Sequence, residues 1–217
     1  DLAWSRGLGD VYKRQVKAFD VSLILYAEHS FNVSTFTART ITSSLSDIHG
    51  AITGAIASLK GPLHGGANEE VMHMMNKIKK PENALKWINK ALDNKDVVMG
   101  FGHRVYKSGD SRVPTMREYF GKVAKIKKDK KFERIYDIVE KVMIDRKNIH
   151  PNVDYPTGPT YHLMGFDTDF FTPIFVISRI TGWSAHIIEQ HAANKLIRPL
   201  ASYKGSNHRK VLQLNQR

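Results

Sequence analysis

Residues 61–78 of the chain read GPLHGGANEEVMHMMNKI and join a loop to a helix. Glycine and proline interrupt regular structure in the first six positions, so we expect a loop over residues 60–66. One titratable side chain, His64, stands in that loop. From Ala67 onward the sequence predicts a helix, because apolar residues recur there at helical spacing, at Val71, Met72, Met74, Met75 and Ile78.

The same combination of a titratable side chain with glycine or proline occurs twice more. Residues 100–106 read GFGHRVY and contain His103, and residues 150–156 read HPNVDYP and contain Asp154. Catalytic groups tend to lie on loops that rigid elements hold in place. Two histidines and a carboxylate in such loops therefore indicate acid–base chemistry.

Helical periodicity continues on both sides of these loops, and few runs alternate with the period of a strand. Residues 34–59 are rich in small side chains, which let helices pack closely. Pro81 suits the first turn of a further helix, whose buried side would carry Leu85, Trp87, Ile88 and Leu92. We therefore expect an all-α fold, with a loop around Asp154 and helices near residues 16–29, 67–78, 81–92, 114–127, 131–147, 160–164 and 170–193.

A change in composition predicts two domains. Residues 67–148 are more charged than the apolar, small-residue segments on either side. We interpret residues 67–159 as a small helical domain inserted in a large, discontinuous one, residues 16–66 and 160–217. Residues 1–15 show no clear period and are expected to be an unrelated leader. The three loops then fall near the domain crossings, where clefts form.

Composition limits the chemistry further. The 217 residues contain no cysteine, which excludes disulfides and thiolate nucleophiles and fits a reducing compartment. The net charge of +12 attracts polyanions such as nucleic acids, phosphorylated cofactors or di- and tricarboxylates. Residues 122–131 alone carry six lysines, so a basic helical module that binds nucleic acid is an alternative function. That alternative leaves His64, His103, Asp154 and Arg179 unexplained.

Arginines point to an anionic ligand. Arg179 lies inside the apolar run IFVISRI, where a buried cation requires a carboxylate partner or an anion. Arg112 follows a Gly-Asp-Ser turn and offers a planar fork for a carboxylate; Arg198 raises the same question more weakly. Each of the chosen residues also has a structural reading: a capping histidine for His64, an Asp-turn or N-cap for Asp154 and an exposed turn for Arg112. No pair of histidines has the spacing of a metal site.

Five segments, in order, resemble the citrate synthase family, which includes 2-methylcitrate synthase: GPLHGGANEEV, GFGHRVYK, HPNVDYPTG, FTPIFVISRITGWSAHIIEQ and NKLIRP. The resemblance covers about residues 18–205 and implies an all-α, two-domain, cytoplasmic homodimer. It implies an acyltransferase that condenses acetyl-CoA or propionyl-CoA with oxaloacetate, giving citrate or 2-methylcitrate and free CoA. No permanently bound cofactor, metal, nucleic acid or membrane partner is implied.

The resemblance also implies roles for residues. Asp154 would remove a proton from the α-carbon of the acyl group, His64 would hydrogen-bond the enolate oxygen, and His103 would polarise the oxaloacetate ketone. His29, Arg112 and Arg179 would hold the oxaloacetate carboxylates, and Arg198 would reach the partner subunit's site. Coenzyme A would contact Val98, Met99, Gly100, Phe101, Gly102 and Lys107.

Two points stay open at this level. The stretch from Pro156 to Trp183 favours 2-methylcitrate synthases or enzymes that accept both substrates, although one methylene gives only about 1–3 kcal/mol of discrimination. Relatives also carry several large-domain helices before the segment that matches Val16. An inactive fragment of such an enzyme is therefore another alternative.

Overall fold

The computed structural model is all-α, which confirms the predicted fold class. It describes residues 2–106 and 108–217, and their side chains except those of residues 2–8 and 10. Within this part of the chain no strand forms, and one isolated antiparallel bridge joins Phe101 to Pro151. The elements are α1 (Leu2–Tyr26), α2 (Val33–Ser43), α3 (Ile48–Leu59), α4 (Ala67–Ile78), α5 (Pro81–Asp93), α6 (Val113–Lys127), α7 (Lys131–Lys147), α8 (Asp154–Met164), the 3-10 turn η1 (Thr168–Phe170), α9 (Phe171–Ala192) and the 3-10 turn η2 (Leu214–Gln216).

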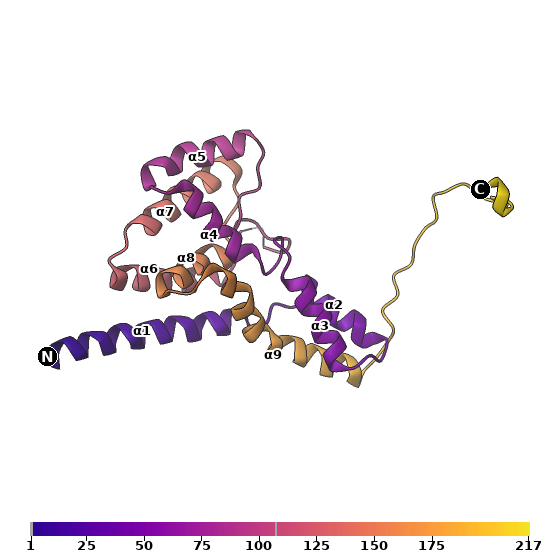
Figure 1. Ribbon diagram of the computed structural model, residues 1–217, viewed down its shortest axis with the longest axis horizontal. Helices are drawn as coiled ribbons and strands as arrows, with labels where there is room; N and C mark the ends of the chain where they lie inside the picture. Colours follow the sequence, from indigo (N-terminus) through magenta and orange to yellow (C-terminus); the bar gives the residue numbers. More distant parts are fainter. Residues whose placement is uncertain (1, 107) are drawn as a thin grey trace.

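The helices pack in two groups, each around its own core (Figure 1). Helices α4 to α8 form the first group, which buries Met75, Ile88, Phe120, Tyr136 and Tyr155, among others. Helices α2 and α3 form the second group together with the later part of α9, and its buried side chains include Ala38, Ala55, Leu59, Trp183 and Ile187.

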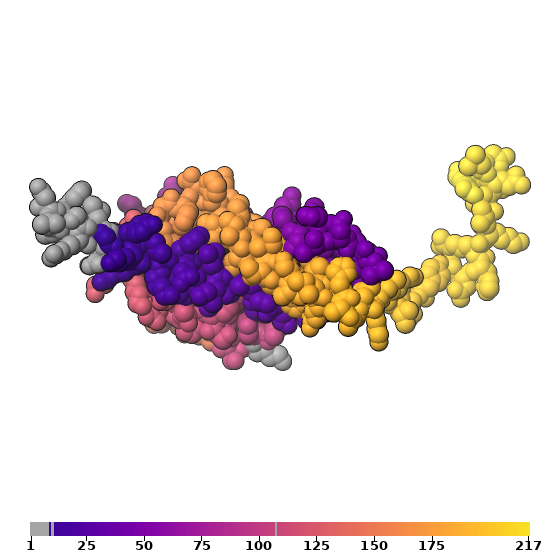
Figure 2. Space-filling view, turned by 90° about the horizontal axis from the view of Figure 1, so that it is seen from below, coloured from indigo at the N-terminus to yellow at the C-terminus, as the bar shows by residue number. Residues whose placement is uncertain are grey.

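Helix α9 connects the two groups. Its first turn places Phe171 and Ile174 in the first core, and the following turns place Phe175 and Trp183 in the second. Figure 2 shows α1 and α9 along one face of the molecule, with the segment after α9 extending away from the body. A side chain at Gly182 would collide with the carbonyl oxygen of Ala27, so glycine lets α9 touch the end of α1.

Local signals account for most helix ends. The side chain of Asn32 accepts a hydrogen bond from the Thr35 amide at 3.1 Å, and Asp47 accepts one from the Gly50 amide at 2.8 Å; both are N-caps. Pro81 occupies the first turn of α5, as predicted. The left-handed residues Lys128 and Asn148 end α6 and α7.

Three predicted details are wrong. The helix expected to begin near Val16 begins at Leu2, because residues 2–15 contain no proline that would stop it, and it ends at Tyr26 rather than near His29. The helix expected from Thr160 begins at Asp154. Leu85 is exposed, because Ala84, Ile88 and Ala91 form the centre of the buried face of α5.

The early start of α8 explains how prolines enter a helix. Pro156 lies in the first turn, where a backbone N–H has no helical partner to lose. Pro159 lies deeper and removes one backbone hydrogen bond. Packing of α8 against α4 and α6 compensates for that loss. Among the described residues, no helix is long and apolar enough to cross a membrane.

Candidate active site

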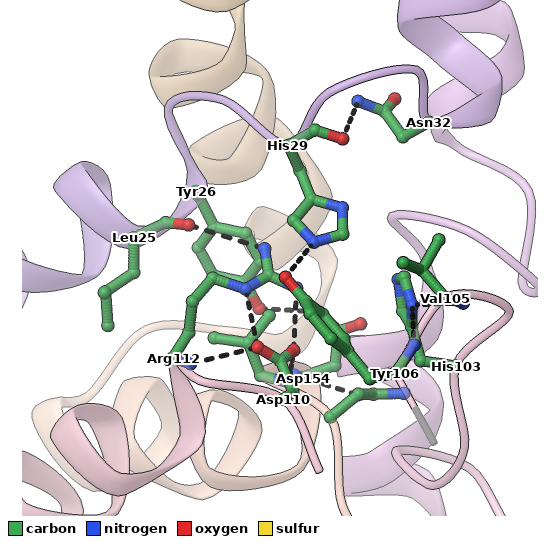
Figure 3. Close-up of polar contacts among 12 residues, drawn as sticks. Leu25, Tyr26, His29, Asn32, His103, Val105, Tyr106, Asp110, Arg112 and Asp154 are labelled. Carbon is green, nitrogen blue, oxygen red and sulfur yellow. Dashed lines mark hydrogen bonds and ion pairs between the residues drawn. The ribbon is translucent and has the colours of Figure 1, made fainter. Parts of the chain in front are cut away.

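One cavity of about 870 Å³ gathers most of the predicted functional side chains. Figure 3 shows His29, His103, Arg112 and Asp154 among them. Its wall comes from the segment after α1, the loop before α4, residues 102–106 with Arg112, the start of α8 and the first half of α9. The predicted residues that line it are His29, His64, Gly102, His103, Arg112, Asp154 and Arg179. Segments far apart in the sequence therefore meet at one place.

Asp154 is the first residue of α8, and its environment raises its basicity. Its backbone N–H donates to Oδ1 of Asn152 at 3.1 Å, which fixes the start of the helix. Burial raises the pKa of the carboxyl to about 6, against the hydrogen bond from Tyr26 and the charge of Arg112, which lower it. A carboxylate with this pKa is mostly ionised at pH 7 and is a stronger base than an exposed aspartate.

His64 lies in the tight turn before α4 and is held from the side of α2. The backbone N–H of Ser34 donates to His64 Nε2 at 3.3 Å, and the Ser34 hydroxyl lies 2.8 Å from the same nitrogen. Since Nε2 accepts a backbone hydrogen bond, we assign the ring hydrogen to Nδ1. Burial, followed by the charge of Arg179, lowers the pKa of His64 to about 4, so the ring is neutral at pH 7.

The turn that carries His64 depends on glycine. A side chain at Gly66 would come within 2.9 Å of the Lys60 carbonyl oxygen, and one at Gly65 would meet Leu59 at 2.5 Å. The amide of Gly66 donates to the Gly61 carbonyl at 3.2 Å and closes the turn. The glycines therefore let the chain fold back tightly just before α4.

His103 is oriented by its own loop. Its Nδ1 accepts hydrogen bonds from the backbone amides of Val105 at 3.1 Å and Tyr106 at 3.4 Å. Nε2 therefore carries the hydrogen of the neutral ring and remains a donor. Burial and the nearby charge of Arg112 lower the pKa of His103.

His29 lies edge-on to His103, with ring centroids 4.9 Å apart. Its Nε2 is 2.8 Å from the hydroxyl of Tyr106. Burial, then the charge of Arg112, lowers the pKa of His29 to about 4. Three neutral imidazoles thus surround the cavity without adding positive charge to that of the arginines.

Arg112 is held by a carboxylate that the sequence did not indicate. Its Nε and Nη2 donate to Asp110 at 3.0 and 2.7 Å. The two residues thus form a bidentate ion pair, and the aspartate side chain is buried. The same carboxylate accepts from the Val153 amide at 3.1 Å, immediately before Asp154. Asp110 therefore links the arginine to the start of α8.

Arg179 is a buried cation, as the apolar run around it suggests. Its Nε donates to the Tyr26 carbonyl at 2.6 Å, and its guanidinium lies over the Phe175 ring. Burial and the charge of Arg112 lower the pKa of Arg179 to about 10, so it stays charged at pH 7. Its Nη1 is buried and has no hydrogen-bond partner within residues 2–106 and 108–217. A buried donor with this charge is suited to a carboxylate ligand.

The remaining predicted residues that the structure describes do not line this cavity. Val98, Met99, Gly100 and Phe101 form the segment that leads into it, and the Gly100 carbonyl accepts from the Asn152 amide at 2.9 Å. Gly102 also lines a neighbouring hollow of about 320 Å³, with His103, Asn148 and His150. Lys107 lies outside the described residues. Arg198 is exposed on the segment after α9, away from the cavity wall.

Sequence reasoning missed the residues that act through others, namely Tyr26, Ser34, Asp110 and Asn152. The partners of Tyr26, Ser34 and Asn152 are distant in the sequence or are backbone atoms, so no local pattern marks these three residues. Asp110 alone carried a signal, because an aspartate two residues before an arginine in a turn can bind its guanidinium. Across the described part of the chain, no group of three histidine or acidic side chains is placed to hold a metal ion.

The fold and the cavity define an all-α protein with acid–base groups beside a buried cationic site. The chain belongs to the citrate synthase family: the family model described as "Citrate synthase, C-terminal domain" matches residues 3–200. The match includes most of residues 1–15.

Curated relatives agree with this assignment. The chain is 59% identical over 202 residues to 2-methylcitrate synthase 2 of Corynebacterium glutamicum, covering 93% of this chain and 53% of that protein. It is 55% identical over 197 residues to a citrate synthase of Mycolicibacterium smegmatis, covering 91% of this chain and 52% of the relative. The chain thus spans about half the length of these relatives.

A solved structure shows the same fold. The citrate synthase of the archaeon Thermoplasma acidophilum, solved in a ternary complex with carboxymethyl coenzyme A and oxaloacetate, has a TM-score of 0.87 and 38% identity. The similarity covers 94% of this chain and 56% of that one.

Proposed function

We propose that this chain carries the catalytic centre of an acyltransferase that condenses acetyl-CoA or propionyl-CoA with oxaloacetate. The observation that carries the proposal is that Asp154, His64 and His103 line one cavity together with Arg112 and Arg179. The names of the relatives, citrate synthase and 2-methylcitrate synthase, support the same reaction.

In the first step Asp154 takes a proton from the α-carbon of the acyl-CoA thioester. That proton is only weakly acidic, so the negative charge that develops on the thioester oxygen needs a donor. The Nδ1–H of His64 is assigned to this oxygen. A neutral histidine suits the role, because a donor of moderate acidity stabilises the enolate without competing with Asp154 for the proton.

In the second step the enolate carbon attacks the ketone carbon of oxaloacetate. The hydrogen bond from the Nε2–H of His103 polarises the ketone and stabilises the negative charge that develops on its oxygen. That oxygen becomes a hydroxyl by taking up one proton, which balances the proton that Asp154 removed from the α-carbon. Water then cleaves the thioester, which releases free CoA and citrate or 2-methylcitrate. Loss of the thioester makes the overall sequence irreversible in practice.

The carboxylates of oxaloacetate are assigned to His29, Arg112 and Arg179. The buried, unpartnered Nη1 of Arg179 supports this assignment, because an anion would satisfy it. The segment from Val98 to Gly102 and Lys107 are assigned to coenzyme A. The hollow beside Gly102 supports that placement. Both substrates bind transiently, and no permanent cofactor is part of the proposal.

The rest of the proposal concerns assembly. We infer a homodimer in which Arg198 reaches the site of the partner, and a small domain over residues 67–159 that closes on the substrates and excludes water. The first core also takes in Tyr161, Phe171 and Ile174, beyond that boundary. A cytoplasmic location is consistent with the absence of cysteine.

The test measures free thiol released from acetyl-CoA and from propionyl-CoA, with and without oxaloacetate. Release that requires oxaloacetate supports the proposal. Release that does not require it, or no release from a folded chain, contradicts it. The ratio of the two rates then distinguishes a citrate synthase from a 2-methylcitrate synthase, a choice that relatives of both names leave open.

A further inference from the structure

Tyr26, which the mechanism does not yet use, is held in one position on every side. It is the last residue of α1 and has no exposed surface. Its ring centroid lies 4.0 Å from that of Phe175, within the second core. Its backbone carbonyl accepts the hydrogen bond from Arg179. The ring therefore has no room to swing away from the cavity.

The Tyr26 hydroxyl contacts the base directly. It donates to Oδ1 of Asp154 at 2.6 Å (Figure 3). Within the part of the chain that the structure describes, Oδ2 of Asp154 accepts no hydrogen bond, and the residue lines the cavity. The tyrosine thus engages one carboxylate oxygen and leaves the other for a substrate.

Several charged or titratable groups face the Asp154 carboxylate. Tyr26 approaches from α1, Asp110 and Arg112 from the segment before α6, and Arg179 from α9. The tyrosine and both arginines favour the ionised carboxylate, whereas Asp110 and burial oppose it. Burial also raises the pKa of Tyr26 well above its ordinary value, so its hydroxyl remains a donor at any pH at which the protein works.

We propose that Tyr26 is the positioning residue of the base: its hydroxyl fixes Oδ1 of Asp154, leaves Oδ2 for the proton of the substrate, and stabilises the carboxylate form. The inference rests on the proposed function only for the role of Asp154 as base. During turnover the proton would move from the α-carbon to Oδ2, while Tyr26 keeps its own. Protonation weakens the hydrogen bond from Tyr26, which favours return of the proton.

The test titrates Asp154 by NMR in the full chain, labelled with ¹³C at the aspartate carboxyl and assigned with Asp154→Asn. In Tyr26→Phe the ring packing is kept and the donor is lost. The titration midpoint of the Asp154 carboxyl is expected to rise by about 1 to 2 pH units, because losing a hydrogen bond to a charged group usually has an effect of this size. Tyr161→Phe is the matched control, because Tyr161 is also buried but its hydroxyl contacts Ser22 at 2.8 Å.

Each result decides the inference. A higher midpoint in Tyr26→Phe, with no change in Tyr161→Phe, supports it. An unchanged midpoint in Tyr26→Phe, or equal shifts in both variants, overturns it. If Tyr26→Phe does not fold, the ζ-carbon resonance of Tyr26 in the unsubstituted protein must titrate with the midpoint of Asp154, and a flat response overturns the inference.

This readout is separate from turnover. If the midpoint shifts but no thiol is released in the assay above, the role of Tyr26 stands and the proposed function fails. If thiol release requires oxaloacetate but the midpoint does not shift, the proposed function stands and the role of Tyr26 fails. In an active chain, the acid limb of kcat should also move to higher pH in Tyr26→Phe.

Discussion

Burial of the Asp154 carboxylate has a cost in stability that depends on pH. Its pKa lies near 6 in the folded protein, above the ordinary value of 3.8, so the folded state binds more protons between these values. The contribution of Asp154 to the free energy of unfolding therefore falls as pH rises from about 4 to 6. Above pH 6 the full destabilisation is present.

Asp154→Asn removes this cost. The variant should be more stable than the unsubstituted protein at pH 7.5, by up to about 3 kcal/mol, and the difference should vanish near pH 4. Urea unfolding at the two pH values measures it. Asp169→Asn, a substitution of an exposed aspartate, is the matched control. A stability difference between Asp154→Asn and the unsubstituted protein that is the same at both pH values would contradict the prediction.

The same carboxylate should control the acid limb of the reaction. Because the pKa values of His29 and His64 lie near 4, these two rings stay neutral as pH falls to 6, and burial lowers the pKa of His103 as well. Protonation of Asp154 then removes the proposed base. We expect kcat/KM to fall about tenfold per pH unit below 6. A limb centred near pH 4 in a pH–rate profile would show that another group limits the reaction.

At the residue scale the sequence indicated the groups that are proposed to react but not those that hold them. His64, His103 and Asp154 lie beside glycines and prolines, and these neighbours can be read directly from the sequence. Tyr26 sits in an ordinary helical pattern, and its partner is 128 positions away. A contact of that kind depends on the packing of α1 against α8 and α9, which no local pattern contains.

At the scale of elements, close helix contacts decide the geometry of the cavity. Gly182 on α9 touches the Ala27 carbonyl and Glu28, which lie between Tyr26 and His29. Gly182→Ala should lower stability by about 1–3 kcal/mol, because the contact is with backbone that cannot move freely. Thermal unfolding measures this loss.

Gly121→Ala is the matched control for that prediction. Its added carbon would meet only Arg117 and Glu133 side chains, at 3.6 and 3.8 Å. It should leave stability unchanged or raise it by about 0.5–1 kcal/mol, since alanine favours the helix. Similar losses in both variants would show that the contact with α1 is not the cause.

The predicted elements were most accurate where apolar periodicity and end signals agree. Residues 67–78 and 131–147 are helical as predicted, because each shows a regular buried face and a distinct end. The start of α8 could not be predicted, since Pro156 and Pro159 suggest a loop when read alone. Packing against α4 and α6 overrides that local preference.

At the scale of the whole molecule, the proposed dimer makes a complementation test possible. Arg198→Ala and Asp154→Asn should each be inactive alone. In a hybrid dimer, the Arg198→Ala subunit keeps its own Asp154 and receives Arg198 from its partner. Chains refolded together in equal amounts should regain about a quarter of the unsubstituted activity, because half of the dimers are hybrids with one intact site each.

Sedimentation supplies the control for this experiment, since the species should have twice the mass of one 24.6 kDa chain. No recovery of activity by sedimenting dimers would contradict the role given to Arg198. A monomer that shows turnover would contradict the need for a partner. Arg198 lies on the exposed segment after α9, so its substitution should not disturb either core.

The Nη1 of Arg179, which has no hydrogen-bond partner among the described residues, has a practical consequence for anyone who handles this protein. A buried guanidinium with such an unsatisfied donor should accept small multivalent anions from the medium. Phosphate or citrate buffers should raise the melting temperature and compete with ligands, whereas chloride of the same ionic strength should do so far less. The choice of buffer anion is thus an experimental variable in its own right.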